Sequence, residues 1–160
     1  MRRRMLGRLI AAVPFVGVAG TAVATLVDAL LPGGDLGRDL LANALLWMVG
    51  VQGWMTGSGH LFFGAPIAAS IGWPADTPWQ WEVGLASLAT GVLGVLASSF
   101  DRDFAVATII AFSVFYLGAA VGHVRELVVA GNRSPGNWGP MLVFDVAAPL
   151  FLIALLVTVG

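Results

Sequence analysis

The chain has 160 residues, of which 58% are hydrophobic and 11% are charged, and its formal net charge is −1. Soluble domains carry about 25% charged residues, so this composition excludes an ordinary water-facing surface. The near-neutral charge, with no basic patch beyond the N-terminus, argues against nucleic acid as a partner. The absence of cysteine excludes disulfides, thiolate metal sites, iron–sulfur clusters and cysteine nucleophiles.

Five apolar runs are long enough to cross a bilayer, since a spanning helix needs about 20 apolar residues. The predicted helices cover residues 9–31, 40–63, 83–100, 104–130 and 141–159. Gly64 and Pro66 mark a break after the second run, because proline lacks the N–H that a helix needs, and residues 65–71 continue as an interfacial segment. In lipid, a single segment of this length can form hydrogen bonds with its own backbone N–H and C=O groups only as a helix. The sequence therefore predicts an all-α, single-domain integral membrane bundle of about five transmembrane helices over residues 1–160.

Arginine placement predicts the orientation of this bundle. The first run follows a basic segment and resembles a secretory signal, but it is long enough to span, so we expect a retained first helix. An N-terminus in the cytoplasm places Arg38 and Arg102 outside and six arginines inside, which obeys the positive-inside rule. The six are Arg2, Arg3, Arg4, Arg8, Arg125 and Arg133. We therefore expect a multi-pass protein of the bacterial inner membrane with a cytoplasmic N-terminus, and the lipid bilayer as its main partner.

A set of ionisable residues within or beside the apolar runs is costly in a membrane and by default indicates function. The set comprises His60, Glu82, His123, Glu126 and Asp145. Because chain direction alternates, His60 and His123 each lie roughly 30 Å from the outer end of their helices at 1.5 Å per residue. Glu82 and Asp145 begin helices on the inner side. All five residues are therefore expected at the cytoplasmic end of the bundle.

Two imidazoles and up to three carboxylates are ligand types that suit a divalent metal such as zinc, iron or manganese. His123 and Glu126 are three residues apart, so both side chains can face one way from a single helix. Haem with His60 and His123 as axial ligands is a less favoured alternative, because the carboxylates would be unneeded and the chain has no attachment motif. The predicted metal ligands are His60, Glu82, His123, Asp145 and Glu126.

Each of these residues also has a structural explanation. A histidine can bond a backbone carbonyl or a carboxylate, and Glu82 suits the first turn of a helix through the helix dipole. Glu126 beside Arg125 fits a solvated interface, and Asp145 could pair with Arg125 or a protonated histidine. The loop at 71–81, rich in proline and tryptophan, fits either an interfacial anchor or a lid over the polar cluster.

The sequence is therefore compatible with two functions. The leading one is a metal-binding membrane protein, an oxidoreductase or hydrolase acting at the inner leaflet. The alternative is a non-enzymatic accessory or scaffold subunit, in a homo-oligomer or larger membrane complex, whose polar network fixes helix register. Glycine pairs four residues apart at 53 and 57 and at 118 and 122 favour close helix packing, within the chain or between copies. A transporter is least favoured, because no paired interrupted half-helices are visible.

Several motifs together resemble a family of small bacterial membrane proteins of unknown function. They are HLFF at 60–63, IGWP at 71–74, PWQWEVG at 78–84, GVLG at 91–94, GAAVGH at 118–123 and SPGN at 134–137, followed by Asp145 and Pro149. The resemblance covers about residues 45–158. It implies a polytopic helical fold and draws attention to His60, Glu82, His123, Asn137 and Asp145. It implies no activity, and Glu126 lies outside its pattern.

Overall fold

The computed structural model describes residues 2–75 and 78–159, with side chains described from residue 12 onward. These residues form helices and connections and contain no β-strand, so the predicted all-α fold is confirmed. The elements are α1 (Arg2–Ala29), α2 (Leu36–Ala44), the π-helix η1 (Leu45–Val51), α3 (Gln52–Phe62), α4 (Gly64–Ile71), α5 (Trp79–Leu96), the 3₁₀-helix η2 (Ala97–Ser99), α6 (Arg102–Val129) and α7 (Pro140–Thr158).

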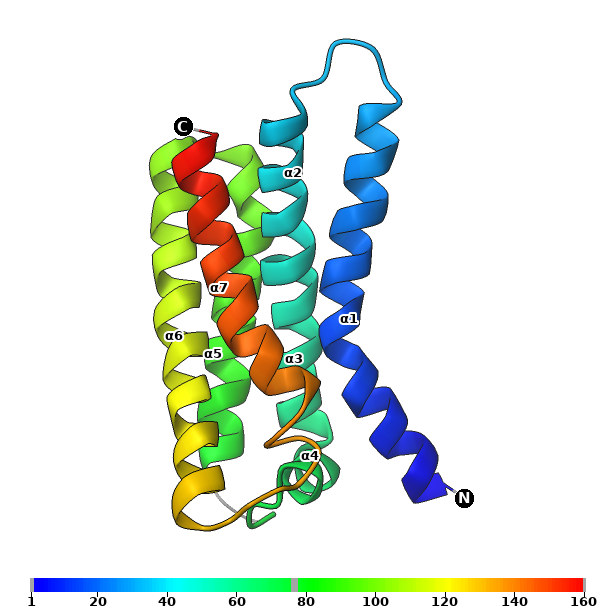
Figure 1. The fold of residues 1–160 in the computed structure, drawn as a ribbon, viewed down its shortest axis with the longest axis vertical. Helices are drawn as coiled ribbons and strands as arrows, with labels where there is room; N and C mark the ends of the chain where they lie inside the picture. Colours follow the sequence, from blue (N-terminus) through cyan, green and yellow to red (C-terminus); the bar gives the residue numbers. More distant parts are fainter. Residues whose placement is uncertain (1, 76–77, 160) are drawn as a thin grey trace.

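The long helices alternate in direction, and the two ends of the chain lie at opposite ends of the bundle (Figure 1). Within the described chain, four helical stretches are long and apolar enough to cross a membrane: 12–29, 79–99, 102–129 and 140–158. The expected fifth span is the continuous column of α2, η1 and α3, which runs the length of the bundle beside them. A π-helical stretch interrupts its α-helical hydrogen bonding at Leu45–Val51.

Local chemistry accounts for several helix ends. Asp35 caps α2 by accepting hydrogen bonds from the backbone N–H groups of Gly37 and Arg38, and Asp101 caps α6 in the same way through Phe104. The predicted break after the second run is present, and α4 begins at Gly64. Gly72 ends α4 with a φ of 81°, a left-handed conformation that glycine adopts at little cost.

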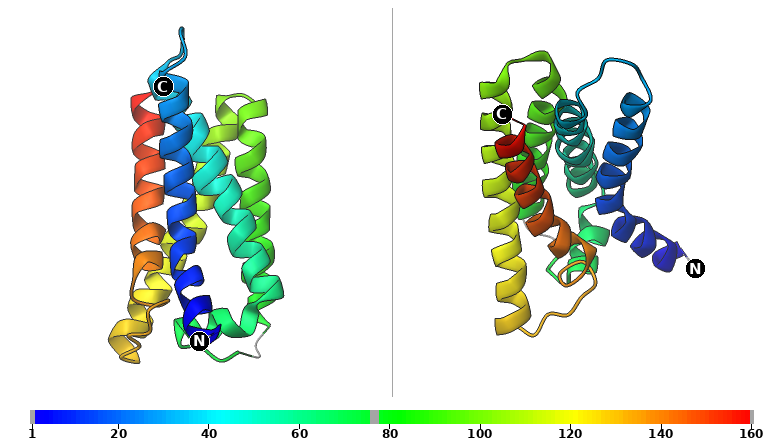
Figure 2. Two further views of the ribbon diagram at one scale, coloured as in Figure 1. Left: turned by 90° about the vertical axis from the view of Figure 1, so that its right-hand side faces the viewer. Right: turned by 45° about the horizontal axis from the view of Figure 1, so that its top comes forward.

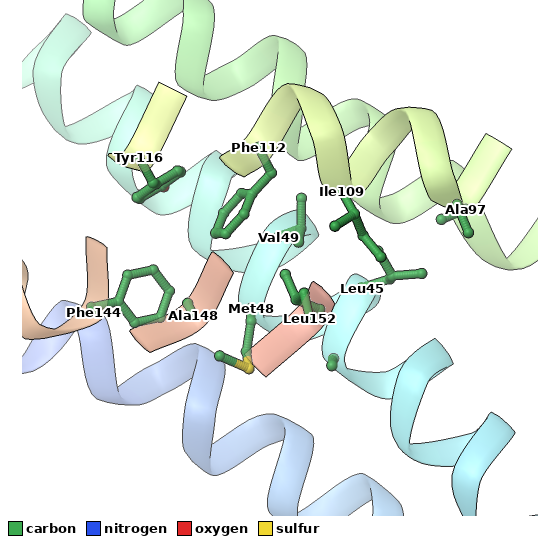
Figure 3. Packing of buried hydrophobic residues seen from close by; sticks show 12 residues of the cluster. Leu45, Met48, Val49, Ala97, Ile109, Phe112, Tyr116, Phe144, Ala148 and Leu152 are labelled. Carbon is green, nitrogen blue, oxygen red and sulfur yellow. The ribbon is translucent and has the colours of Figure 1, made fainter. Parts of the chain in front are cut away.

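Two kinds of packing hold the bundle together. The hydrophobic core joins η1, α6 and α7, with Phe112, Ile109 and Leu152 almost completely buried (Figure 3). By contrast, α3 and α5 approach through small residues. A methyl group built on Gly53 would lie 2.7 Å from the Cα of Gly91, so no larger side chain fits between these two backbones. Close backbone approach of this kind is how membrane helices gain packing energy in lipid.

One end of the bundle is covered by connections, and we call it the loop end. It contains α4, residues 72–75 and residues 130–139 (Figures 1 and 2). Hydrogen bonds join the 130–139 connection to the end of α4, because the Gly136 N–H donates to the Ser70 carbonyl and the Asn132 side chain donates to the Ile71 carbonyl, each at 2.9 Å. The final turns of α3 and α6 and the first turns of α5 and α7 meet here, which positions the polar residues.

Candidate functional site

His60 is fixed at the loop end by a neutral amide. Its Nδ1 lies 2.6 Å from Oε1 of Gln80, and the Gln80 Nε2 donates to the Gly64 carbonyl at 2.9 Å. Since the amide nitrogen is engaged as a donor, the amide oxygen must accept, and His60 Nδ1 therefore carries the proton. This arrangement connects α3, α4 and α5 and leaves the Nε2 of a neutral His60 without a proton.

His123 is also fixed by a hydrogen bond to a side-chain amide, which here comes from Asn137. Its Nδ1 lies 2.8 Å from Oδ1 of Asn137, whose side-chain nitrogen donates to the carbonyls of His123 at 3.2 Å and Asn132 at 2.9 Å. Asn137 is completely buried. The same reasoning places a proton on His123 Nδ1 and leaves Nε2 free to accept a proton or to bind a metal.

Asp145, in the second turn of α7, faces this free nitrogen. Its Oδ2 lies 3.8 Å from His123 Nε2, and the residue is only 3% exposed. This separation is too long for a hydrogen bond, which needs about 2.7–3.2 Å. Among the described residues, no hydrogen bond reaches the Asp145 carboxylate. A buried carboxylate opposite a deprotonated ring nitrogen is unfavourable unless a proton or another cation lies between them.

Two tryptophans connect the two histidines. The ring centroids of His60 and Trp79 are 5.5 Å apart, those of Trp79 and Trp73 are 5.0 Å apart, and those of Trp73 and His123 are 5.6 Å apart with the rings stacked. The two imidazoles are therefore linked through a chain of contacts between two indole rings. Trp73 Nε1 is buried without a hydrogen-bond partner in the described chain, which is unusual for a buried indole.

The structure brings together only part of the predicted metal-ligand set. His123 and Asp145 form a pair, whereas His60 is engaged with Gln80 and Trp79. Glu82 is exposed in the first turn of α5, and Glu126 is half-buried in α6. Within residues 2–75 and 78–159, no three histidine, aspartate or glutamate side chains gather closely enough to hold a metal ion. The metal and the haem alternative both stay predictions.

The residue types that organise the site are mostly neutral. Charge does not single out Gln80 in the sequence, although an amide side chain at the start of an apolar helix is a signal that the sequence does contain. Asn137 was indicated only by the family resemblance. Trp73 and Trp79 were expected as an interfacial anchor or a lid, and both are half-buried in contact with a histidine.

Comparison with known protein families matches residues 8–159 to one described as a family of unknown function (DUF6790). This confirms the expected resemblance to a family of unknown function, and the match also includes the first helix. No curated protein and no solved structure was found to match the chain.

Proposed function

Because the chain belongs to DUF6790, a family of unknown function, we propose its role from the geometry of the loop end. The protein is an integral membrane protein that binds a divalent metal cation between His123 and Asp145. One observation carries this proposal: the Asp145 carboxylate is buried, has no hydrogen bond from the described residues, and faces a ring nitrogen that carries no proton in neutral histidine. A purely structural network would be expected to give this carboxylate a hydrogen-bond donor.

The geometry of the pair suits a metal better than a direct hydrogen bond. A histidine that binds a metal usually donates its other ring N–H to a carbonyl or carboxylate, and Asn137 supplies such an oxygen to His123. Bonds of about 2.0–2.2 Å at a tetrahedral angle place two ligand atoms about 3.4 Å apart. The observed 3.8 Å between Nε2 and Oδ2 needs only a small closure to reach that value.

An ion held by two protein ligands keeps open coordination positions for water or substrate. Imidazole with carboxylate is a donor set that zinc, iron and manganese accept. Open positions are what metal-assisted hydrolysis and metal-centred redox chemistry require, so a hydrolase or oxidoreductase at the cytoplasmic face follows from this proposal. His60, Glu82 and Glu126 supply no ligand in this arrangement.

Metal binding to the purified protein tests the proposal. Protein in mild detergent is dialysed against Zn²⁺ or Mn²⁺, and bound metal is measured by mass spectrometry for the wild type and for Asp145→Asn, His123→Gln and His60→Gln. We expect one ion per chain for the wild type and for His60→Gln, the matched control. Both His123→Gln and Asp145→Asn should bind about 100-fold more weakly, because each loses one of only two protein ligands.

Two results would contradict this assignment. Wild-type protein without bound metal at saturating concentrations would remove the cation site. An equal loss in His60→Gln would instead indicate the wider ligand set expected from the sequence. Gel filtration and helical circular dichroism of each variant check that it is folded, so that lost binding reports on the site.

A second function, a non-enzymatic scaffold or accessory subunit, is favoured by a different observation. The amide groups of Gln80 and Asn137 have both their donor and acceptor atoms engaged: Gln80 joins α3, α4 and α5 to one another, and Asn137 joins the 130–139 connection to α6. Such a network fixes helix register without any ligand. It predicts that Zn²⁺ and Mn²⁺ leave the unfolding temperature unchanged in the wild type and in Asp145→Asn alike.

A further inference from the structure

Trp73 lies against His123 at the loop end, and several contacts fix its ring. The indole stacks on the His123 imidazole, with ring centroids 5.6 Å apart and an angle of 26° between the planes. Trp79 packs against the same indole at an angle of 74°, with centroids 5.0 Å apart. The backbone N–H of Trp73 donates to the Ala68 carbonyl at 2.9 Å, directly after the left-handed turn at Gly72. The fold of the chain therefore sets the place of this indole beside His123.

These contacts leave the indole N–H of Trp73 unused. Its Nε1 is shielded from solvent and donates to no acceptor among the residues that the structure describes. An indole nitrogen is a donor only, so nothing but an acceptor can satisfy it. Buried indoles usually find such a partner. We therefore expect the acceptor to come from a bound ligand.

The cation proposed between His123 and Asp145 can bring an acceptor to this place. A metal bound to an imidazole lies in the plane of the ring, about 2.0–2.2 Å from the nitrogen. A cation with two protein ligands keeps further positions for oxygen ligands, and some of these positions project out of the ring plane. Trp73 covers one face of the His123 ring. An oxygen that binds the cation on that face meets the indole.

The combination of a cation and an N–H selects the kind of oxygen. Hydrogen bonds to an ionised acceptor are roughly twice as strong as those between neutral groups. A metal and a fixed N–H that act on one oxygen stabilise negative charge there, which is how sites for metal-assisted hydrolysis hold an oxyanion. A carboxylate or phosphate oxygen therefore fits this position better than a neutral oxygen.

We propose that the site binds a substrate with an anionic oxygen, which the cation coordinates and the Trp73 N–H contacts as a donor. This inference rests on the proposed function, because the cation is the one assigned to His123 and Asp145. It adds the class of substrate and one residue, Trp73, that binds it. Trp79 supports the indole by packing and donates nothing to the ligand.

Acetate binding to protein loaded with Co²⁺ tests this inference. Co²⁺ accepts the same donor atoms as zinc, and its visible spectrum reports an anion that enters its coordination sphere. Trp73→Phe keeps an aromatic ring against His123 and removes the N–H, and Trp79→Phe makes the same change in the neighbouring indole as the matched control. We expect equal Co²⁺ affinity in the wild type and both variants. Acetate should bind about tenfold more weakly to Trp73→Phe alone, and acetamide, its neutral analogue, should bind the wild type more weakly than acetate.

The outcomes separate this inference from the proposal on which it rests. Wild-type protein that binds no Co²⁺ would overturn both. Normal Co²⁺ binding with equal acetate affinity in the wild type and Trp73→Phe would overturn the role of Trp73 alone, as would an equal loss in Trp79→Phe. Equal binding of acetate and acetamide would overturn the preference for an anionic oxygen. If Trp73→Phe fails to fold, benzothienylalanine at Trp73 replaces the N–H with sulfur in a ring of the same shape, and the same weaker acetate binding is expected.

Discussion

The two histidines of this chain sit in closely similar amide clamps but have different surroundings. In each, a buried side-chain amide accepts from Nδ1 and donates to a backbone carbonyl, so both imidazoles are held in one tautomer. The free nitrogen of His123 faces the carboxylate of Asp145, whereas the ring of His60 meets the edge of Trp79. The amide interaction is therefore common to both histidines, and the facing carboxylate is what distinguishes the proposed cation site from the surroundings of His60.

The helix pairs that carry these histidines also differ in how completely their polar groups find partners. Gly53 and Gly91 let α3 and α5 pack backbone to backbone, and the His60 clamp completes that interface. The α6–α7 pair has a well-packed aromatic core, but the Asp145 carboxylate receives no hydrogen bond from the described residues and lies 3.8 Å from His123 Nε2. Proteins keep such locally unfavourable groups mainly at functional sites. Four substitutions test these differences, and they follow in decreasing order of the stability change that we expect.

Gly53→Leu should be the most damaging change. The added side chain would collide with the Gly91 backbone, and overpacking of this kind costs about 3 kcal/mol. The measurement is the free energy of unfolding in a denaturing detergent titration. Gly118→Leu is the control, because a methyl group there meets nothing within 4 Å and should change stability by less than about 0.5 kcal/mol. A large loss in Gly118→Leu would instead show that a second copy covers this face of α6.

Asn137→Ala should cost about 2–3 kcal/mol. The change removes the acceptor of His123 Nδ1 and the donor to two backbone carbonyls, so buried polar groups lose their partners. Thermal unfolding followed by circular dichroism measures the effect. A loss below about 0.5 kcal/mol would mean that water replaces the amide and that the clamp does not fix the ring.

Gln80→Ala should cost less, about 1–2 kcal/mol, because Gln80 makes one donated and one accepted hydrogen bond. The same thermal assay compares it directly with Asn137→Ala. In the metal-binding assay, Gln80→Ala should leave the affinity unchanged, since the clamp on His60 lies outside the proposed cation site. If Gln80→Ala proves more destabilising than Asn137→Ala, the ranking of the two clamps is wrong.

Asp145→Asn should have the smallest effect on stability, and its sign is diagnostic. Without metal, replacing a buried carboxylate that has no hydrogen bond from the described residues should leave the protein unchanged or up to about 1 kcal/mol more stable. Unfolding in the presence of a chelator measures this difference. A loss of several kcal/mol would show instead that Asp145 is a structural member of an ion pair with protonated His123.

The helical membrane architecture could be predicted from the sequence, because hydropathy and backbone hydrogen bonding leave few alternatives in lipid. Alternating chain direction also predicts that the ends of four helices meet at one end of the bundle. In the structure, His60, His123 and Asp145 lie in helix turns at that end. The clamps could not be predicted in the same way. Gln80 and Asn137 are neutral, and their pairing with His60 and His123 depends on how α5 and the 130–139 connection are rotated and placed.

The amino-acid sequence is enough to show that this chain crosses a membrane as a bundle of helices and that few ionisable groups lie within it. Which of these groups contact one another depends on the tertiary structure. It paired His123 with Asp145, linked the two imidazoles through Trp73 and Trp79, and left Glu82 exposed. The reason is that helix formation follows from local backbone chemistry, whereas helix rotation is set by side-chain packing between segments distant in sequence.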